Sequence, residues 1–318
     1  MLAMVRFFEM NGDRQTAWRA IRLTRSTLPD GTAESRRALY SSALEQAEQQ
    51  FRAAASVGPE SRPLNLFYGL SQAGRAIAAA RTPDGQAVSP IVSGHGLKVH
   101  ELDALRPGDD IFGLQVRGEG GRDTSFGRLA WLTGSDSLQP GGVALAAVWM
   151  MLPEVSLDFP IEGHHPAQLV DADGDSLRLP VPDDEDADLL RAAYPQLGPA
   201  ELTDGTFGYT GNTPGEGTPV RRFHLPDAQQ TLSNYRGSPA LMPAWREGGG
   251  HLDPLLAWWV MLYALSMLAR YRPVEWTRAI DVDKSPRAVW LEQLLDKALD
   301  AVPLQLYIAL TGARPGTR

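Results

Sequence analysis

The sequence predicts an α+β protein, with a mainly helical body formed by both chain ends and a β-rich insertion in the middle. Apolar residues recur at helical spacing before residue 84 and after residue 245. The stretch between them is rich in Gly, Pro and Asp and carries only short apolar runs. We therefore divide the chain into 1–83, 84–245 and 246–318, of which the first and last build the body.

The first segment, residues 13–56, is expected to be helical. Leu39, Leu44, Ala47 and Phe51 recur at intervals of three to five residues, close to the stripe of an amphipathic helix. Thr32 is a suitable N-cap, because its hydroxyl can accept a hydrogen bond from a free backbone N–H and acid follows it.

The stretch "SRPLNLFYGLSQAGRAIAAAR" from Ser61 predicts a helix buried on most sides. Ser61 can cap it and Pro63 suits its first turn. Apolar and small residues form two stripes, one of Leu66, Leu70, Ala73, Ile77 and Ala80 and one of Leu64, Phe67, Ser71 and Gly74. Gly69 and Gly74 each cost such a helix about 1 kcal/mol relative to Ala. Close packing of a neighbouring helix can offset that cost.

The same stretch admits a second interpretation, in which Ser71 is the nucleophile of a serine hydrolase. Gly69, Ser71 and Ala73 come close to the G-x-S-x-G turn between a strand and a helix. The preceding "PLNLF" lacks β-branched residues, and the residues before it look helical, so no sheet is built there. We therefore prefer the helix, with Ser71 as a small packing residue.

The middle segment is expected to contain short strands in "IFGLQV", "RLAWLTG" and "SLRLPV". One helix, "GGVALAAVWMMLPEV", interrupts them and is expected to end near Pro153. The stretches "PVPDDEDADLL" and "TGNTPGEGTPV" are expected to be loops.

The last segment begins with a helix that Asp253 caps and that Pro254 opens. Arg270 and Arg272 favour its C-terminal end, and Pro273 stops it. Its uncharged run from Leu255 to Ala269 has 15 residues, and a membrane span needs about 20. We therefore expect a central core helix and no membrane span, followed by one or two more helices.

Composition narrows the chemistry. The chain has a net charge of −8, which argues against a surface dedicated to nucleic acid. It has no cysteine, which excludes disulfides, thiolate catalysis and cysteine zinc sites. Its start does not have the pattern of a signal peptide, and the lack of cysteine fits a reducing cytoplasm. No phosphate-binding glycine motif and no metal-ligand spacing is present, and we expect neither cofactor nor metal.

Two arginine motifs remain as candidates. Arg246 and His251, separated by a glycine run, match the pair with which some helical ribonucleases direct a 2′-hydroxyl at a phosphate, and this ribonuclease is our alternative function. The stretch "ARYRPVEW" holds Arg270, Tyr271 and Trp276 at a helix end. It can bind an anion or a base, or it can simply pin the helix end through an Arg–acid pair and a buried Trp.

The chain resembles the YaaC-like proteins of bacteria in "SRPLNLFYGLSQAGRAIAAA", in "HGL" at 95–97 and in "LYALSMLARYRPVEW". The order of these stretches matches the family pattern over most of the chain. The residues that we carry over as a binding or structural motif are Arg62, Tyr68, Arg75, His95, Gly96, Arg270, Tyr271 and Trp276.

The resemblance implies a cytoplasmic bacterial protein without an established catalytic activity. Some relatives belong to anti-phage defence operons, which implies a sensor or adaptor that acts with a protein partner, and RNA is a second partner class. The pattern also looks like the helical HEPN class, which includes ribonucleases, but Arg75 and His95 lie 20 residues apart. Only Arg246 and His251 have the short spacing of that catalytic pair. We therefore favour a recognition protein and commit to no catalytic residue.

Overall fold

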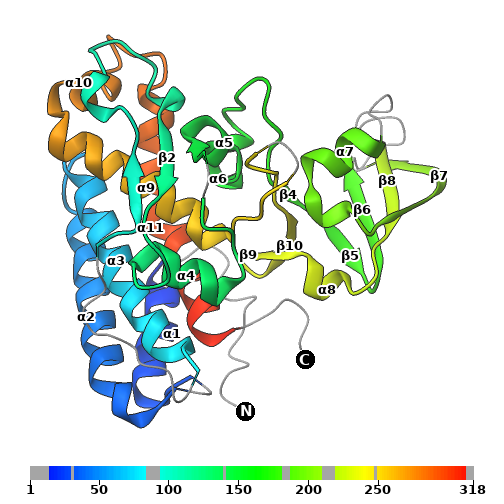
Figure 1. Ribbon diagram of the computed structural model, residues 1–318, viewed down its shortest axis with the longest axis horizontal. Helices are drawn as coiled ribbons and strands as arrows, with labels where there is room; N and C mark the ends of the chain where they lie inside the picture. Colours follow the sequence, from blue (N-terminus) through cyan, green and yellow to red (C-terminus); the bar gives the residue numbers. More distant parts are fainter. Residues whose placement is uncertain are drawn as a thin grey trace.

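The computed structural model describes residues 14–29, 32–83, 94–138, 141–180, 187–209, 219–246 and 249–312. Long helices from both ends of the chain lie side by side, and a small β-rich unit lies at the opposite end of the molecule (Figure 1). The predicted class, a mainly helical α+β fold, is confirmed. No helix in these ranges is both long enough and apolar enough to span a membrane.

The N-terminal helices are α1 (Arg14–Ser26), α2 (Arg37–Ala54) and α3 (Arg62–Arg81), with a short 3₁₀ turn at Glu34–Arg36 before α2. The continuous α3 confirms the predicted helix. Two of the predicted caps are wrong. The Thr32 hydroxyl donates to the carbonyl of Ala80 at 3.5 Å, and Ser61 precedes α3 but makes no capping hydrogen bond with its side chain. Pro63 in the first turn already removes one of the free N–H groups that a cap would satisfy.

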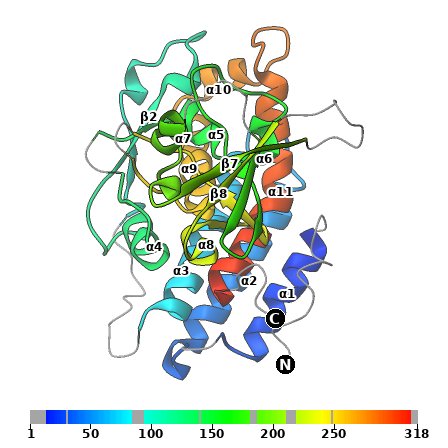
Figure 2. The same ribbon diagram turned by 90° about the vertical axis from the view of Figure 1, so that its right-hand side faces the viewer.

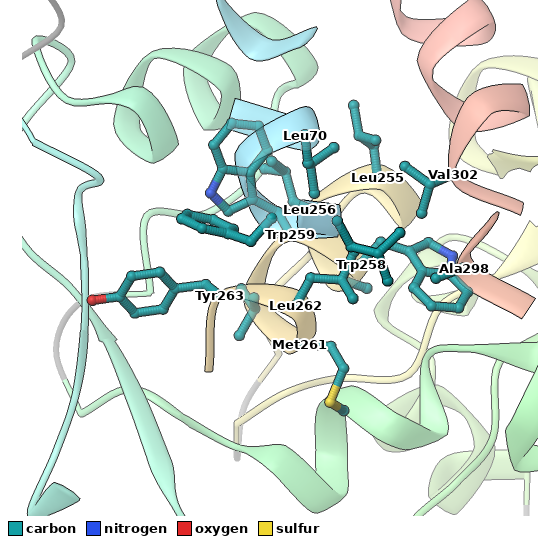
Figure 3. Packing of buried hydrophobic residues seen from close by; sticks show 14 of the residues in the cluster. Leu70, Leu255, Leu256, Trp258, Trp259, Met261, Leu262, Tyr263, Ala298 and Val302 are labelled. Atoms are coloured by element: carbon teal, nitrogen blue, oxygen red, sulfur yellow. The ribbon is translucent and has the colours of Figure 1, made fainter. Parts of the chain in front are cut away.

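The C-terminal helices are α9 (Pro254–Tyr271), α10 (Pro273–Ala279) and α11 (Ala288–Thr311). As predicted, the Asp253 carboxylate accepts a hydrogen bond from the Leu255 N–H at 2.9 Å, and Pro273 separates α9 from α10. Every side chain of α9 from Pro254 to Ser266 is buried. Figure 3 shows Trp258 and Leu255 of this helix facing Ala298 and Val302 of α11, with Leu70 of α3 nearby. The predicted core helix is confirmed.

Two glycines let α3 approach its neighbours closely. A Cβ atom on Gly74 would lie 2.6 Å from the indole ring of Trp259, and one on Gly69 would lie 2.7 Å from the ring of Phe51 on α2. These separations are too short for a real carbon contact. Helix packing therefore explains both glycines, as the sequence predicts.

The first part of the middle segment joins the body. Strands β1 (Leu97–Val99), β2 (Gln115–Gly118) and β3 (Val143–Ala144) form an antiparallel sheet in the order β1-β2-β3. The remaining elements are short 3₁₀ turns at Leu102–Ala104 and Ile111–Gly113 and the helices α4 (Ser125–Thr133), α5 (Leu145–Met150) and α6 (Pro153–Ser156). Apolar residues of β1, β2, α4, α5 and α6 share one hydrophobic cluster with α9, so this region is part of the main core.

The second part of the middle segment has a hydrophobic cluster of its own. An antiparallel sheet of order β5-β6-β8-β7 is formed by β5 (Asp171–Asp173), β6 (Ser176–Pro180), β7 (Glu201–Tyr209) and β8 (Pro219–His224). Helices α7 (Ala187–Ala193) and α8 (Ala228–Thr231) and a 3₁₀ turn at Pro195–Leu197 accompany it (Figure 2). A smaller sheet, β4-β10-β9, comprises β4 (Gln168–Leu169), β9 (Ser233–Tyr235) and β10 (Ser238–Leu241).

A buried polar network ties the β9–β10 hairpin to the body. The Tyr235 hydroxyl donates to the Glu154 carboxylate on α6 and accepts from the Trp258 indole N–H at 3.2 Å. Burial raises the pKa of Glu154, and burial followed by the Glu154 charge raises the pKa of Tyr235. On β10, Ala240 lies in the main cluster and Leu241 in the second, so this hairpin contacts both cores.

Some expectations for the middle segment are wrong. "RLAWLTG" lies in α4 and not in a strand, because the Thr124 hydroxyl caps the helix by accepting from the Gly127 N–H at 3.2 Å and Gly134 ends it with φ of 71°. Helices α4 to α8 lie where one helix is predicted, and "GGVALAAVWMMLPEV" is divided at Pro153 into α5 and α6. The predicted strand "SLRLPV" is confirmed as β6, whereas "IFGLQV" joins a 3₁₀ turn to the start of β2. Residues 210–218 of the predicted loop "TGNTPGEGTPV" lie outside the described residues.

We predict that Gly74→Ala lowers the free energy of unfolding. Alanine gains about 1 kcal/mol of helix propensity, but the new methyl group overlaps the buried Trp259 ring, and overpacking of a core costs roughly 1–3 kcal/mol. Urea denaturation measures the difference. Gly113→Ala is the matched control, since no atom lies within 4 Å of its added carbon. A Gly74→Ala protein at least as stable as the native one would contradict the packing argument.

Candidate functional site

Five of the eight residues carried over from the family pattern lie together at one edge of the helical body. Tyr68 and Arg75 come from α3, His95 from the loop before β1, and Arg270 and Tyr271 from the end of α9. We call these five residues the His95 cluster. Arg270 connects it, because its Nη1 donates to the Tyr68 hydroxyl at 3.0 Å and its guanidinium lies 5.0 Å from the centre of the Tyr271 ring.

The His95 imidazole is half-buried against two aromatic rings. The Phe67 ring lies edge-on to it with a centroid distance of 5.0 Å, and the Tyr263 ring is tilted at 5.9 Å. Figure 3 shows Tyr263 extending away from Trp258 and Met261, so this residue of α9 reaches from the core toward the site. Its hydroxyl donates to the Leu97 carbonyl at 2.6 Å and thereby fixes the chain beyond His95.

The loop that carries His95 is held by backbone hydrogen bonds. The Phe126 N–H at the start of α4 donates to the His95 carbonyl at 3.1 Å, and the Glu119 N–H donates to the Gly96 carbonyl at 2.9 Å. Gly96 has φ of 76°, and a Cβ atom there would lie 2.3 Å from the Thr124 hydroxyl oxygen. Both the backbone angle and the packing therefore require glycine beside His95.

The cluster concentrates positive charge. Burial and the nearby charges of Arg270 and Arg75 lower the pKa of His95, so its imidazole is neutral at pH 7 and can both donate and accept a proton. Among the described residues, neither Arg75 nor Arg270 forms an ion pair with a carboxylate. Burial and then the charge of Glu119 raise the pKa of Tyr263. The Glu119 carboxylate itself forms an ion pair with Lys98 at 3.8 Å. Two guanidinium groups thus face the site without a counter-ion from the described chain.

The other motif residues stabilise the fold. Arg62 donates to the carbonyls of Ala54 and Val57 at 3.1 Å after α2, and it forms an ion pair with Asp296 of α11. The buried Trp276 donates its indole N–H to the Glu60 carbonyl at 3.1 Å. These residues fasten α10 and α11 to the connection between α2 and α3.

The arginines of "ARYRPVEW" have two different roles. Arg272 forms an ion pair with Glu275 at 2.5 Å and also donates to the Leu105 carbonyl. With the buried Trp276, this is the pinned helix end that the sequence offered as one of its two interpretations. Arg270, two residues earlier, belongs to the His95 cluster instead. Successive side chains at the end of a helix point in different directions, so one short motif contributes Arg272 to packing and Arg270 to the site.

The residues of the ribonuclease alternative have other neighbours. The Arg246 guanidinium lies 4.7 Å from the centre of the Trp245 ring. The His251 N–H donates to the Asp136 carboxylate at 2.7 Å, and burial lowers the pKa of the His251 imidazole while the Asp136 charge acts in the opposite direction. Arg246 is not among the charges that shift this pKa.

The geometry of Ser71 does not provide a hydrolase site. Ser71 lies inside the continuous helix α3, and the strand and sharp turn that expose a nucleophilic serine are absent on either side of it within the described chain. In the same ranges, no group of three or more His, Asp or Glu side chains is arranged to hold a metal ion.

Phe67 and Tyr263 complete the site but were not predicted as site residues. The sequence places Phe67 on the second stripe of α3 and Tyr263 in the core run of α9, where both look like ordinary packing residues. Phe67 gives no further signal. Tyr263 gives one, because a buried Tyr needs a hydrogen-bond partner for its hydroxyl. That rule indicates that Tyr263 bonds something, without indicating what.

Comparison with known proteins identifies the family of this chain. A model of the family described as YaaC-like Protein matches residues 6–310. The search of curated proteins finds no match, and the search of solved structures finds none either. The matched range includes every residue of the His95 cluster. The chain therefore belongs to the YaaC-like protein family.

Proposed function

We propose that this chain is a non-enzymatic recognition protein whose ligand site is the His95 cluster, where it binds a phosphate or carboxylate group. One observation carries the proposal. The charges of Arg270 and Arg75 both add to burial in lowering the pKa of His95, and neither arginine has a carboxylate partner in the described chain. An arginine fork matches such anions with two parallel hydrogen bonds. An anion between the two guanidinium groups would remove their mutual repulsion.

The chemistry of His95 also fits binding better than catalysis. A neutral imidazole beside two cations can donate one hydrogen bond to an anion. A bound negative charge favours the imidazolium and so strengthens the interaction as the ring takes up a proton. The described chain places no carboxylate or hydroxyl nucleophile in hydrogen-bond contact with this ring.

The wider role that we propose is that of a sensor or adaptor in a bacterial anti-phage defence system, acting with a partner protein. The support is the family pattern together with the exposed aromatic surface beside the cluster. Tyr271 is 55% exposed and Tyr68 is 40% exposed. Aromatic residues and arginine are enriched at protein interfaces, so this surface suits a partner that brings or covers the anion.

The ligand site predicts the behaviour of two single variants. Arg75→Ala and Arg270→Ala should each weaken binding of pyrophosphate about tenfold, because a hydrogen bond to a charged group contributes about 1.5–3 kcal/mol. Isothermal titration calorimetry on the full chain measures this loss. Arg19→Ala, an exposed arginine on α1, is the matched control and should bind like the native protein. Equal affinities in all four proteins would contradict the proposal.

The lowered pKa of His95 predicts a pH dependence with a defined sign. The ring gains its proton below its usual range in the free protein, and a bound anion raises that pKa, so affinity should increase as the pH falls from about 7 to about 5. Sulfate is the probe, because its own charge is constant over this range. His95→Gln should lose the dependence. Native affinity that stays flat or falls with acidification would overturn the role of His95.

The partner proposal predicts a specific co-purification. A protein encoded beside this gene should be recovered with the tagged native chain from phage-infected bacterial cells, and less of it with Tyr68→Ala/Tyr271→Ala. Quantitative mass spectrometry compares the two samples. A gene without such a neighbour, or equal recovery with both chains, would count against an adaptor. Cleavage of mixed RNA by the native chain but not by His251→Ala would instead support the ribonuclease alternative.

A further inference from the structure

A pocket of about 300 Å³ lies between the loop before β2 and the helices α10 and α11. It shares no residue with the His95 cluster. Its lining includes charged and apolar side chains, of which the argument uses Arg106, Phe112, Arg278, Arg287 and Leu291. We call it the α10–α11 pocket. Its volume lies at the lower end of the range of small-molecule sites.

Two arginines hold the walls of this pocket in place. Arg272 donates to the Leu105 carbonyl, next to Arg106 of one wall, and to Glu275 of α10 in the other wall. Arg287, just before α11, forms an ion pair with Asp110 at 3.0 Å. The same Asp110 accepts from the Phe112 N–H at 3.1 Å and so fixes the turn that carries this ring. The pocket is therefore formed before any ligand arrives.

Arg287 also presents an unused donor. Its guanidinium lies over two neighbouring rings, 4.7 Å from the centre of Phe112 and 5.1 Å from that of Trp290. Its Nη1 is buried and has no hydrogen-bond partner in the described chain. A buried donor without an acceptor is unfavourable, and a ligand oxygen in the pocket would satisfy it.

The mouth of the pocket carries two further guanidinium groups that the described chain leaves without an ion pair, Arg106 and Arg278. The other charges are largely engaged: Lys284 pairs with Asp281, and Asp109 accepts from the Arg106 backbone N–H at 2.8 Å. Positive charge at the rim and a spare donor at the wall thus surround an apolar floor of Ile111, Phe112 and Leu291.

We propose that the α10–α11 pocket binds a small organic anion, with one phosphate or carboxylate group on Arg106 and Arg278 and a planar apolar part against Phe112. The spare N–H of Arg287 donates a hydrogen bond to an oxygen of the ligand. Phosphate and carboxylate share the chemistry that a guanidinium fork recognises, so the experiment separates the two sources.

The test is isothermal titration calorimetry of the full chain with AMP for the phosphate and benzoate for the carboxylate. At least one should bind with a Kd of about 1 mM or tighter. Arg106→Ala/Arg278→Ala should weaken that binding at least about tenfold, since each guanidinium contributes a charged hydrogen bond. Both residues are exposed, so the variant keeps its fold. Arg14→Ala/Arg19→Ala removes two exposed charges from α1 and is the matched control.

Three outcomes would overturn the proposal. Neither anion binds at about 1 mM, or the two double variants lose affinity equally, which indicates a non-specific charge effect. The third outcome is a loss in Arg75→Ala that exceeds the loss in Arg106→Ala/Arg278→Ala, because the ligand then occupies the His95 cluster. The proposal is supported if Arg75→Ala still binds AMP or benzoate and Arg106→Ala/Arg278→Ala does not. This result would indicate a second site whether or not the His95 cluster binds pyrophosphate.

Discussion

The packing of α9 against α3 fixes the positions on which the rest of this structure depends. Thirteen consecutive residues of α9, Pro254–Ser266, are buried, so the helix has no solvent face until its last turn. The wide Trp259 ring fits only where Gly74 leaves α3 bare. This contact sets the register of the two helices, and the register decides which side chains meet where α9 emerges from the core. Arg270 lies beside Tyr68 for that reason.

The His95 loop is positioned by the same core from the other side. Tyr263 leaves the buried face of α9 and bonds the Leu97 carbonyl at 2.6 Å, while the first turn of α4 bonds the His95 carbonyl. Since α4 packs on both α3 and α9, all the elements that carry the cluster rest on one rigid unit. The core thus fixes the backbone positions of these residues, which lowers the cost of ordering the site when an anion binds.

The sequence predicts the helical body well because α3 and α9 carry signals that act locally. Pro63, the Asp253 cap and Pro273 set or bracket helix ends, and the apolar pattern gives the burial. The prediction from sequence fails for α4, because a short apolar run there resembles a strand although the Thr124 cap and the Gly134 stop bracket a helix. The family pattern selects Arg75, His95 and Arg270, but neither the pattern nor their spacing predicts that they meet, because contacts between distant segments are set by tertiary packing. The pocket by α10 has no sequence signal, because its lining comes from separate segments.

An acidic partner distinguishes the arginines that stabilise the fold from those that are available to a ligand, and the neighbouring sequence does not. Arg62, Arg272 and Arg287 each have an acidic partner, and each joins elements that are distant in the chain or fixes a helix end. Removing one of them would leave carbonyls or carboxylates unsatisfied, so their loss acts through stability. Arg75, Arg270, Arg106 and Arg278 have no acidic partner in the described chain. The chain has a net charge of −8, so most arginines have acids available to them. A guanidinium group that forms no ion pair keeps its hydrogen-bond donors for an anionic ligand.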